Sequence, residues 1–402
     1  MKKVFIVGAK RSAIGSFMGT LGTMHPADFG SQVLKQLLDE TKINKNDIDE
    51  VLVGNILPAG LKQGVARQTS IKAGIPVEVP AYGVNMVCGS GMKTVMNAYA
   101  NIKLGLHDLV VAGGVESMSQ APFIVPANIR AGVRMGEQKL LDHMLYDALS
   151  DAFDHEHMGM TAERIVDKYN ITREEQDEFA INSQLKAIKA IEEGKFKSEI
   201  APVTVKLRRE EIVFDTDEYV NKTTSLEKLG TLRPAFKKDG SVTAGNSSGI
   251  NDGASFIILA SEDYIKAHNL KPLAEVIAIG QGGVDPSVMG LGPTPAIKNA
   301  LEMANLKLSD IELFELNEAF AAQSLGVIKE LVDAHNVTKD FILENTNLNG
   351  GAIALGHPVG ASGNRIIVTL LYEMLRSNKK LGLASLCIGG GMGTAVILKK
   401  GE

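Results

Sequence analysis

The segment NKNDIDEVLV at residues 44–53 recurs in a changed form as KLSDIELFEL at residues 307–316, and both copies follow an amphipathic helical pattern. The two copies lie 263 positions apart (residue 47 to residue 310). A second pair of turns, GSG at residues 89–91 and ASG at residues 361–363, lies 272 positions apart (residue 91 to residue 363) and in the same order. These long, similar offsets predict one domain duplicated in tandem, because a solenoid has a far shorter period. Coincidence is the alternative, since Asp followed by Ile is common after helices.

Strand-like and helix-like patterns alternate around the first segment. Apolar runs at residues 4–7 and 51–56 predict buried strands, and between them residues 26–41 carry apolar side chains at helical spacing. Residues 89–104 then predict a helix, and residues 108–112 predict the next buried strand. This alternation is typical of an α/β fold, in which helices pack on the faces of a sheet.

The chain has 402 residues, enough for two or three domains with buried cores. Its middle part is charged and contains methionines, and a helix there opens with the capping box Thr172 to Glu175. We expect this part to be an insertion, which often carries ligand or subunit contacts. The expected division is an N-terminal half (1–118 plus 250–270), an inserted loop domain (119–249) and a C-terminal half (271–402).

Composition excludes several classes of protein. The net charge is −5, so the chain has no basic excess for binding nucleic acid. Two cysteines cannot form a disulfide framework, which indicates a reducing compartment, and we expect the cytoplasm. Residues 4–9 are too few for the apolar region of a signal peptide. Residues 381–398 are uncharged, but the glycines at 389–391 predict two short strands around a turn instead of a membrane span.

Both cysteines adjoin glycine-rich turns. Cys88 lies at the expected start of a helix, where unpaired N–H groups and the helix dipole are expected to lower its pKa and populate the thiolate. Cys387 ends an apolar strand before the three glycines 389–391, whose N–H groups can form an oxyanion hole. A phosphate-binding loop is disfavoured there, because no Lys-Ser or Lys-Thr pair follows. For each cysteine taken alone, inert packing in the core is the alternative.

Two further positions carry polar groups in apolar surroundings. His357 lies in a stretch of glycine and alanine, residues 349–363, where a satisfied core histidine is the alternative to a catalytic one. Asn317 and Glu318 follow an apolar strand, where helix capping is the simpler interpretation. No metal site is expected, because His155 and His157 lack further partners at ligand spacing. A complete dinucleotide fingerprint is also missing, which disfavours an NAD-linked oxidoreductase.

Together, four stretches in this order resemble the thiolase family along essentially the whole chain. They are residues 85–91 around Cys88, NEAF at 317–320, GHP at 356–358 and CIGGG at 387–391. The segment HMGMTAE at residues 157–163 is similar to the biosynthetic acetoacetyl-CoA type, in which the methionine narrows the acyl pocket. The resemblance implies two duplicated βαβ-rich halves in five layers, α-β-α-β-α. It also implies a loop domain for CoA binding and tetramer contacts, and a homotetramer built from tight dimers.

The resemblance implies a reversible Claisen condensation of two acetyl-CoA to acetoacetyl-CoA and CoA. His357 takes the proton of Cys88, whose thiolate becomes acetylated, while N–H groups of Cys88 and Gly389 hold the oxyanion. Cys387 then removes a proton from a second acetyl-CoA, and the ordinary pKa of a thiol suits that transfer. His357 and a water held by Asn317 stabilise the enolate. No cofactor beyond CoA is expected, because the thioester itself acidifies the α-carbon.

Other residues match family positions that line the pantetheine and acetyl tunnel: His157, Met158, Ser248, Met289, Ala319 and Phe320. At the nucleotide end the sequence departs from the bacterial biosynthetic members, with Asn221 and Lys228 where those have an arginine and a serine. A longer connection at residues 329–345 has no assigned role.

Other functions compete with this interpretation. A broader-chain 3-ketoacyl-CoA thiolase of fatty-acid degradation has the same catalytic residues. A ketoacyl synthase or a hydroxymethylglutaryl-CoA synthase has His or Glu where Cys387 stands, and a non-catalytic lipid-carrying relative lacks one cysteine. If both thiols reach one small substrate, mild oxidation is a possible switch that joins Cys88 to Cys387.

Overall fold

A computed structural model describes residues 2–401. The elements of the first half are β1 (Val4–Arg11), β2 (Gly15–Ser16), α1 (Pro26–Thr41), β3 (Glu50–Gly54), α2 (Val65–Lys72), β4 (Ala81–Val84), α3 (Ser90–Lys103), β5 (Leu109–Ser117), β10 (Asn251–Ser261) and α7 (Glu262–His268). Those of the second half are β11 (Ala274–Gly283), α8 (Pro293–Ala304), β12 (Leu313–Leu316), α9 (Ala321–His335), α10 (Lys339–Glu344), α11 (Ala352–Leu355), α12 (Val359–Ser377), β13 (Leu381–Ile388) and β14 (Met392–Lys400).

The two halves repeat one strand topology. In the first half, β3 pairs with β5 in parallel, β5 pairs with β10 and β10 pairs with β1, the last two antiparallel. In the second half, β12, β13, β14 and β11 pair in the same order and the same senses. Strands β1 and β11 pair briefly and join both halves into one mixed sheet. The tandem duplication predicted from the sequence repeats is therefore confirmed.

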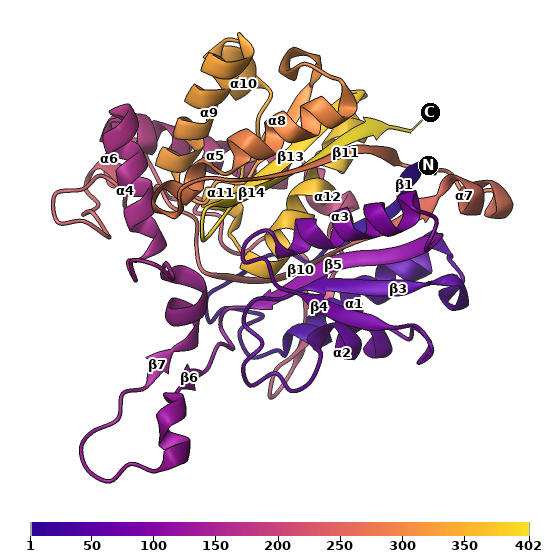
Figure 1. Cartoon of the computed structure of the whole chain (residues 1–402), viewed down its shortest axis with the longest axis horizontal. Helices are drawn as coiled ribbons and strands as arrows, with labels where there is room; N and C mark the ends of the chain where they lie inside the picture. The colour runs from indigo at the N-terminus through magenta and orange to yellow at the C-terminus, as the bar shows by residue number, and fades with distance from the viewer. Residues whose placement is uncertain (1, 402) are drawn as a thin grey trace.

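The helices complete five layers (Figure 1). Helices α1 and α2 cover the outer face of the first half, and α8 and α9 cover the outer face of the second. Between the two half-sheets lie α3 and α12, which contact each other and strands of both halves. This arrangement confirms the α-β-α-β-α order, and it places the N-termini of the two central helices at the junction between the halves.

Close contact between the central helices depends on glycines at the repeated turns. A Cβ on Gly91 would lie 2.9 Å from the backbone nitrogen of Asn364, and one on Gly363 would lie 2.6 Å from the nitrogen of Met92. Neither backbone can give way, since each belongs to a packed helix. Gly91 and Gly363, the residues that the repeat aligns, therefore meet across the junction as equivalent partners.

Most local elements agree with their sequence patterns. Helix α1 covers residues 26–41 as expected, and its apolar stripe of Phe29, Val33, Leu34, Leu37 and Leu38 is buried. The uncharged segment 381–398 forms β13 and β14 around a turn, in which Gly390 and Gly391 have φ of 84° and 85°. Within residues 2–401, no helix combines the length and the apolarity that a bilayer span requires.

Residues 119–249 contain helices and short strands outside the main sheet. They are β6 (Phe123–Ile124), β7 (Leu141–Asp142), α4 (Met158–Tyr169), α5 (Arg173–Glu192), β8 (Val203–Lys206), β9 (Glu211–Phe214) and α6 (Leu226–Gly230). The hairpin of β6 and β7 forms an arm that projects from the body at the lower left of Figure 1. The longer connection at residues 329–345, to which the sequence assigned no role, comprises the end of α9 and all of α10.

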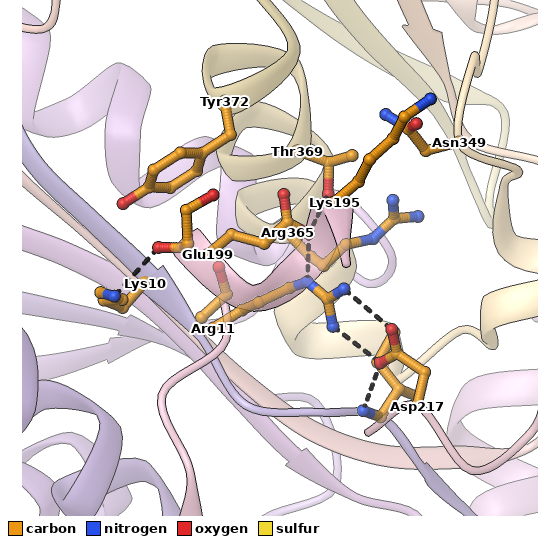
Figure 2. A network of polar contacts seen from close by, with 12 residues as sticks. Lys10, Arg11, Lys195, Glu199, Asp217, Asn349, Arg365, Thr369 and Tyr372 are labelled. Carbon is orange, nitrogen blue, oxygen red and sulfur yellow. Dashed lines mark hydrogen bonds and ion pairs between the residues drawn. The ribbon is translucent and has the colours of Figure 1, made fainter. Parts of the chain in front are cut away.

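A buried charge network ties this segment to the two halves (Figure 2). The guanidinium of Arg11, at the end of β1, donates to Glu199 at 2.6 Å and to both carboxylate oxygens of Asp217 at 2.7 and 2.9 Å. All three side chains are fully buried. Thr369 of α12 donates to the same Glu199 oxygen at 3.2 Å. Elements of both halves are thus fastened to the inserted segment beneath the junction.

Candidate active site

One apolar cavity of about 500 Å³ lies at the junction of the halves and the inserted segment. Ten of the eleven site residues expected from the sequence line it: Cys88, His157, Met158, Ser248, Met289, Ala319, Phe320, His357, Cys387 and Gly389. They come from segments up to about 300 residues apart in the chain, and the duplicated topology brings those segments together. The eleventh residue, Asn317, is not part of the lining.

Cys88 precedes α3 on a strained turn. Val87 has φ of 45°, a left-handed conformation that is unfavourable for a β-branched residue and typical of functional sites. The backbone N–H groups of Gly389 and of Cys88 itself act to lower the pKa of the Cys88 thiol. Burial nevertheless outweighs these donors and raises the pKa of the thiol to about 11. The expectation of a lowered pKa is wrong for the unliganded protein, and a separate base is needed.

His357 supplies a basic nitrogen near the cavity. Its Nδ1 lies 2.6 Å from Oγ of Ser362, whose hydroxyl donates to the carbonyl oxygen of Pro358 at 3.0 Å. Oγ therefore accepts from Nδ1–H, and Nε2 carries the free lone pair. Nε2 is buried and has no hydrogen-bond partner among residues 2–401. Burial and the charge of Arg365 lower the pKa of His357 to about 3, so the imidazole is neutral.

The backbone around His357 is held from the first half. Asn251 accepts the N–H of His357 through Oδ1 at 2.9 Å. Gly356 has φ of 106°, and a Cβ there would lie 2.4 Å from the amide carbon of Asn251. A side chain at this position would be both strained and blocked. The glycine before His357 therefore lets Asn251 anchor the catalytic turn.

Cys387 is the penultimate residue of β13, opposite Gly393 of β14. It is buried, and both burial and the neighbouring Cys88 raise the pKa of its thiol. The sequence argument assumed an ordinary thiol pKa, so that assumption is corrected: Cys387 rests as the neutral acid. Both cysteines are free thiols in the structure.

Asn317 lies behind the cavity, in the turn between β12 and α9. The N-cap of α9 is Phe320, so capping does not explain Asn317. Its side chain is buried, and neither amide atom has a hydrogen-bond partner within the described residues. A buried amide without partners is unusual in a native protein and marks a site for a polar ligand. The carboxylate of neighbouring Glu318 already has hydrogen-bond donors, because it accepts from the side chains of Ser183 and Asn347 and from the N–H of Ile353.

An aromatic wall that the sequence did not reveal borders the cavity. His157 stacks on Phe236, with ring centroids 4.6 Å apart and planes at 19°, and Phe236 meets Phe320 edge-on. His157 also accepts the N–H of Gly159 through Nδ1 at 3.0 Å and so caps α4. Phe236 lies in a loop without periodicity, so no sequence pattern pointed to it. Ser362, in contrast, stands in the glycine-rich stretch, five residues after His357.

The loop with Ser248 completes the lining. The N–H of Ser248 donates to the carbonyl oxygen of Ala319 at 2.9 Å, which places this loop beside the NEAF turn. A second, more polar cavity of about 470 Å³ contains Asn221 and Lys228, and Tyr219 and Ala244 border both cavities. Asn221 and Lys228 therefore lie in a cavity that adjoins the site.

Residues 2–401 contain no group of three or more His, Cys, Asp or Glu arranged to hold a metal ion. The arrangement instead combines two thiols, a neutral imidazole and backbone N–H donors at an apolar cavity. Such a set can perform nucleophilic acyl transfer and proton transfer at the adjacent carbon.

Comparison with known proteins agrees with this chemistry. Residues 4–263 match the model for the thiolase N-terminal domain and residues 270–400 the model for the thiolase C-terminal domain. An acetyl-CoA acetyltransferase of Syntrophomonas wolfei is 52% identical over 99% of both chains.

Solved structures are equally similar. The acetyl-CoA acetyltransferase of Bacillus anthracis has a TM-score of 0.95 and 42% identity, over 100% of this chain and 99% of that chain. The human mitochondrial 3-ketoacyl-CoA thiolase in complex with CoA has a TM-score of 0.92 and 41% identity, over 99% and 98% of the two chains. Matches of this extent and identity, on a cavity with two thiols and a free imidazole nitrogen, show that the chain belongs to the thiolase family of acyltransferases acting on acetyl-CoA.

Proposed function

We propose that the chain catalyses the reversible condensation of two acetyl-CoA to acetoacetyl-CoA and CoA, through an acetyl-Cys88 intermediate. One observation carries the proposal: thiols from the two halves, Cys88 and Cys387, line one apolar cavity together with His357, whose Nε2 is unpartnered. A ketoacyl synthase or hydroxymethylglutaryl-CoA synthase does not have this second thiol.

The first step acetylates Cys88. Because the resting thiol and imidazole are both neutral, deprotonation accompanies attack on the thioester carbonyl and does not precede it. Nε2 of His357 takes the thiol proton as the carbon–sulfur bond forms. The negative charge passes to the carbonyl oxygen, and we propose that the N–H groups of Cys88 and Gly389, which also act to lower the pKa of the Cys88 thiol, stabilise it.

The neutral thiol of Cys387 completes this step. As the first CoA departs as a thiolate, it takes the proton of Cys387, which becomes a thiolate beside acetyl-Cys88. The acetylated neighbour no longer bears ionisable charge, so the contribution of Cys88 to the raised pKa of Cys387 is lost. His357 retains the proton from Cys88 and is now an imidazolium.

The second step forms the carbon–carbon bond. The Cys387 thiolate removes a methyl proton of the second acetyl-CoA, and the imidazolium of His357 donates to the enolate oxygen. A water held by Asn317 is the second hydrogen-bond donor to that oxygen. The enolate carbon attacks acetyl-Cys88, and the expelled Cys88 thiolate recovers its proton from His357. All three groups regain their starting protonation, so the cycle balances.

CoA is proposed to lie along the loop with Ser248. His157, Met158, Met289, Ala319 and Phe320 would contact its pantetheine arm. Support comes from the human 3-ketoacyl-CoA thiolase, which was solved in complex with CoA and matches along the whole chain. Asn221 and Lys228 border the adjoining polar cavity, where a nucleotide end fits by polarity. No further cofactor enters the proposed cycle.

The experiment is thiolysis of acetoacetyl-CoA, followed by loss of the absorbance of its magnesium enolate after free CoA is added. We expect activity in the unsubstituted protein and none in Cys88→Ser. Cys387→Ala is expected to accept one acetyl group, detected by intact mass, but more slowly, because CoA then leaves without the proton of Cys387. It should fail to exchange the methyl protons of acetyl-CoA with D₂O. Undiminished turnover of Cys88→Ser would refute the acetyl-enzyme.

A broader-chain 3-ketoacyl-CoA thiolase is the second candidate. The cavity favours it in one respect, since its lining is apolar and includes Met118 and Leu149 near Cys88. A series of kcat/KM values over 3-ketoacyl-CoA lengths decides between them. A steep fall beyond four carbons supports the acetoacetyl type, and constant or rising values support the broader type.

We also propose that the protein acts as a cytoplasmic homotetramer built from tight dimers. The projecting arm supports an assembled state, because its apolar side chains are exposed in the isolated chain: Phe123, Val125, Ile129, Val133, Met135 and Leu140. Exposed apolar surface of this extent is typical of protein contacts. Light scattering after gel filtration should give a tetramer for the unsubstituted chain and a smaller species for Met135→Asp.

A further inference from the structure

Glu116 is a buried carboxylate to which the proposed reaction assigns no role. It lies near the end of β5, where the first half meets the second, and is fully buried. Four N–H donors converge on it: Nδ2 of Asn55 at 2.9 Å, and the backbone nitrogens of Ile56 at 3.0 Å, Leu57 at 3.2 Å and Gly360 at 2.9 Å. Because every partner is a donor, this geometry is complementary to the ionised carboxylate.

Gly360 belongs to the other half and fits a socket made of glycines. A Cβ on Gly54, Gly91 or Gly114 would lie 2.7, 2.9 or 2.1 Å from the carbonyl oxygen of Gly360. A Cβ on Gly360 itself would lie 2.5 Å from Oε2 of Glu116. The peptide of Gly360 is therefore enclosed by first-half backbone on one side and bound by a first-half carboxylate on the other.

This socket lies between the two catalytic turns. Gly360 follows His357 by three residues at the start of α12, and Gly91 follows Cys88 by three residues at the start of α3. A shift at Gly360 would carry the imidazole with it, since only Pro358 and Val359 separate them. The distance between the base and the thiol thus depends on how Gly360 is held.

The charge of Glu116 also acts on the nucleophile. After burial, the charge of Glu116 contributes to raising the pKa of the Cys88 thiol. Burial, and to a smaller extent the charge of Asp252 on β10, raises the pKa of the Glu116 carboxyl to about 7. A negative charge beside a thiol opposes the thiolate, so Glu116 does not activate Cys88 electrostatically. Its benefit to the reaction must come from placement.

We propose that Glu116 is a positioning residue, whose carboxylate binds the N–H of Gly360 and so holds the His357 turn against the Cys88 turn. The inference rests on the proposed acetyl transfer from CoA to Cys88. Loss of the carboxylate charge should then have two opposite effects. Turnover should fall because the base is displaced, and the thiol of Cys88 should become more acidic because a nearby negative charge is gone.

Glu116→Gln is the main test, because the side chain keeps its size but loses its charge and one acceptor. We expect kcat for thiolysis of acetoacetyl-CoA to fall roughly 10- to 100-fold, as a displaced reacting group commonly causes. KM for CoA should stay within about twofold, since none of the groups proposed to contact CoA touches Glu116. Alkylation of Cys88 by iodoacetamide should become faster when it is measured above neutral pH, where a Glu116 carboxyl with a pKa of about 7 is ionised. Glu116→Asp retains the charge, so it should not accelerate alkylation. It also serves as the second variant if Glu116→Gln does not fold.

Glu163→Gln is the matched control. Glu163 is another buried carboxylate that accepts backbone N–H groups, those of Ser241 and Val242, but it is not among the groups that shift the pKa of Cys88. It should leave the alkylation rate of Cys88 unchanged. Full turnover in Glu116→Gln would overturn the inference, as would lost turnover with alkylation no faster than in Glu163→Gln. If the unsubstituted protein lacks thiolysis, the proposed function itself fails, and that outcome is distinct from either of these.

Discussion

Nδ1 of His357 lies 2.6 Å from Oγ of Ser362, which stands five residues later in the first turn of α12. The hydroxyl proton of Ser362 is directed at the carbonyl oxygen of Pro358, so the imidazole must donate through Nδ1 and keep Nε2 as its base. A single serine therefore selects both the tautomer and the orientation of the His357 imidazole.

Replacing Ser362 by Ala should slow the reaction without abolishing it. The lost hydrogen bond is worth about 1 kcal/mol, which corresponds to a roughly five- to tenfold lower kcat in thiolysis. Ser324→Ala is the control, because Ser324 is also buried but its hydroxyl has no partner in the described chain. Equal kcat values for Ser362→Ala and the unsubstituted protein would contradict the role of Ser362.

The lowered pKa of His357 should appear in the pH dependence of stability. The group titrates at about 3 when folded and near 6.5 when unfolded, so between these values the unfolded chain binds a proton that the folded chain does not. Stability should therefore fall as the pH decreases through this window. The raised pKa values of Glu116 and Glu315 instead make stability rise as the pH decreases. The contribution of His357 must therefore be measured as a difference between two proteins.

That measurement compares His357→Asn with the unsubstituted protein. Urea midpoints recorded at several pH values at one protein concentration should show a weaker loss on acidification in the variant. A constant difference between the two proteins across the window would mean that His357 is not the group responsible.

Asn317→Ala should separate the two proposed half-reactions. Removing a donor from an oxyanion site commonly costs about 10²- to 10³-fold in rate, and here only the enolate step should lose it. We expect acetylation of Cys88, seen by intact mass, to be retained while exchange of the methyl protons of acetyl-CoA with D₂O declines. A parallel loss of acetylation and exchange would show that Asn317 only supports the fold.

Met158→Ala should widen the acyl specificity. Met158 is buried at the cavity, and its sulfur lies 3.4 Å from where a Cβ on Gly389 would be, so the side chain limits space beside the cysteines. The ratio of kcat/KM for a six-carbon to a four-carbon 3-ketoacyl-CoA should rise roughly tenfold or more, the usual effect of a methylene in an apolar pocket. Met303→Ala, at an exposed position on α8, should leave the ratio unchanged.

Arg11→Met should destabilise the protein strongly. It leaves the carboxylates of Glu199 and Asp217 buried without their cation, a loss of about 3 to 5 kcal/mol for a broken buried pair. Lys189→Met removes only an exposed ion pair with Glu193, so its effect should stay below about 1 kcal/mol. Similar urea midpoints for the two variants would refute the anchoring role of the network.

Local patterns in the sequence were sufficient to predict much of the fold. The apolar spacing at residues 26–41 predicted α1 to the residue, and the repeated turns around Gly91 and Gly363 predicted the duplication. These features follow from short-range rules of periodicity, capping and glycine placement, which a chain carries without its tertiary context.

The chemistry of the site residues depends on their tertiary environment, which no local sequence pattern contains. From the sequence alone, Cys88, Cys387, His357 and Asn317 were identified as candidates, and their resemblance to the thiolases named the reaction. Only the tertiary structure decided their protonation states, because burial raises the pKa values of both thiols and lowers that of His357. The tertiary structure alone revealed the hydrogen bond from Gly360 to Glu116, two residues 244 positions apart. Such a contact, and the burial of both groups, arise only when the two halves pack against each other.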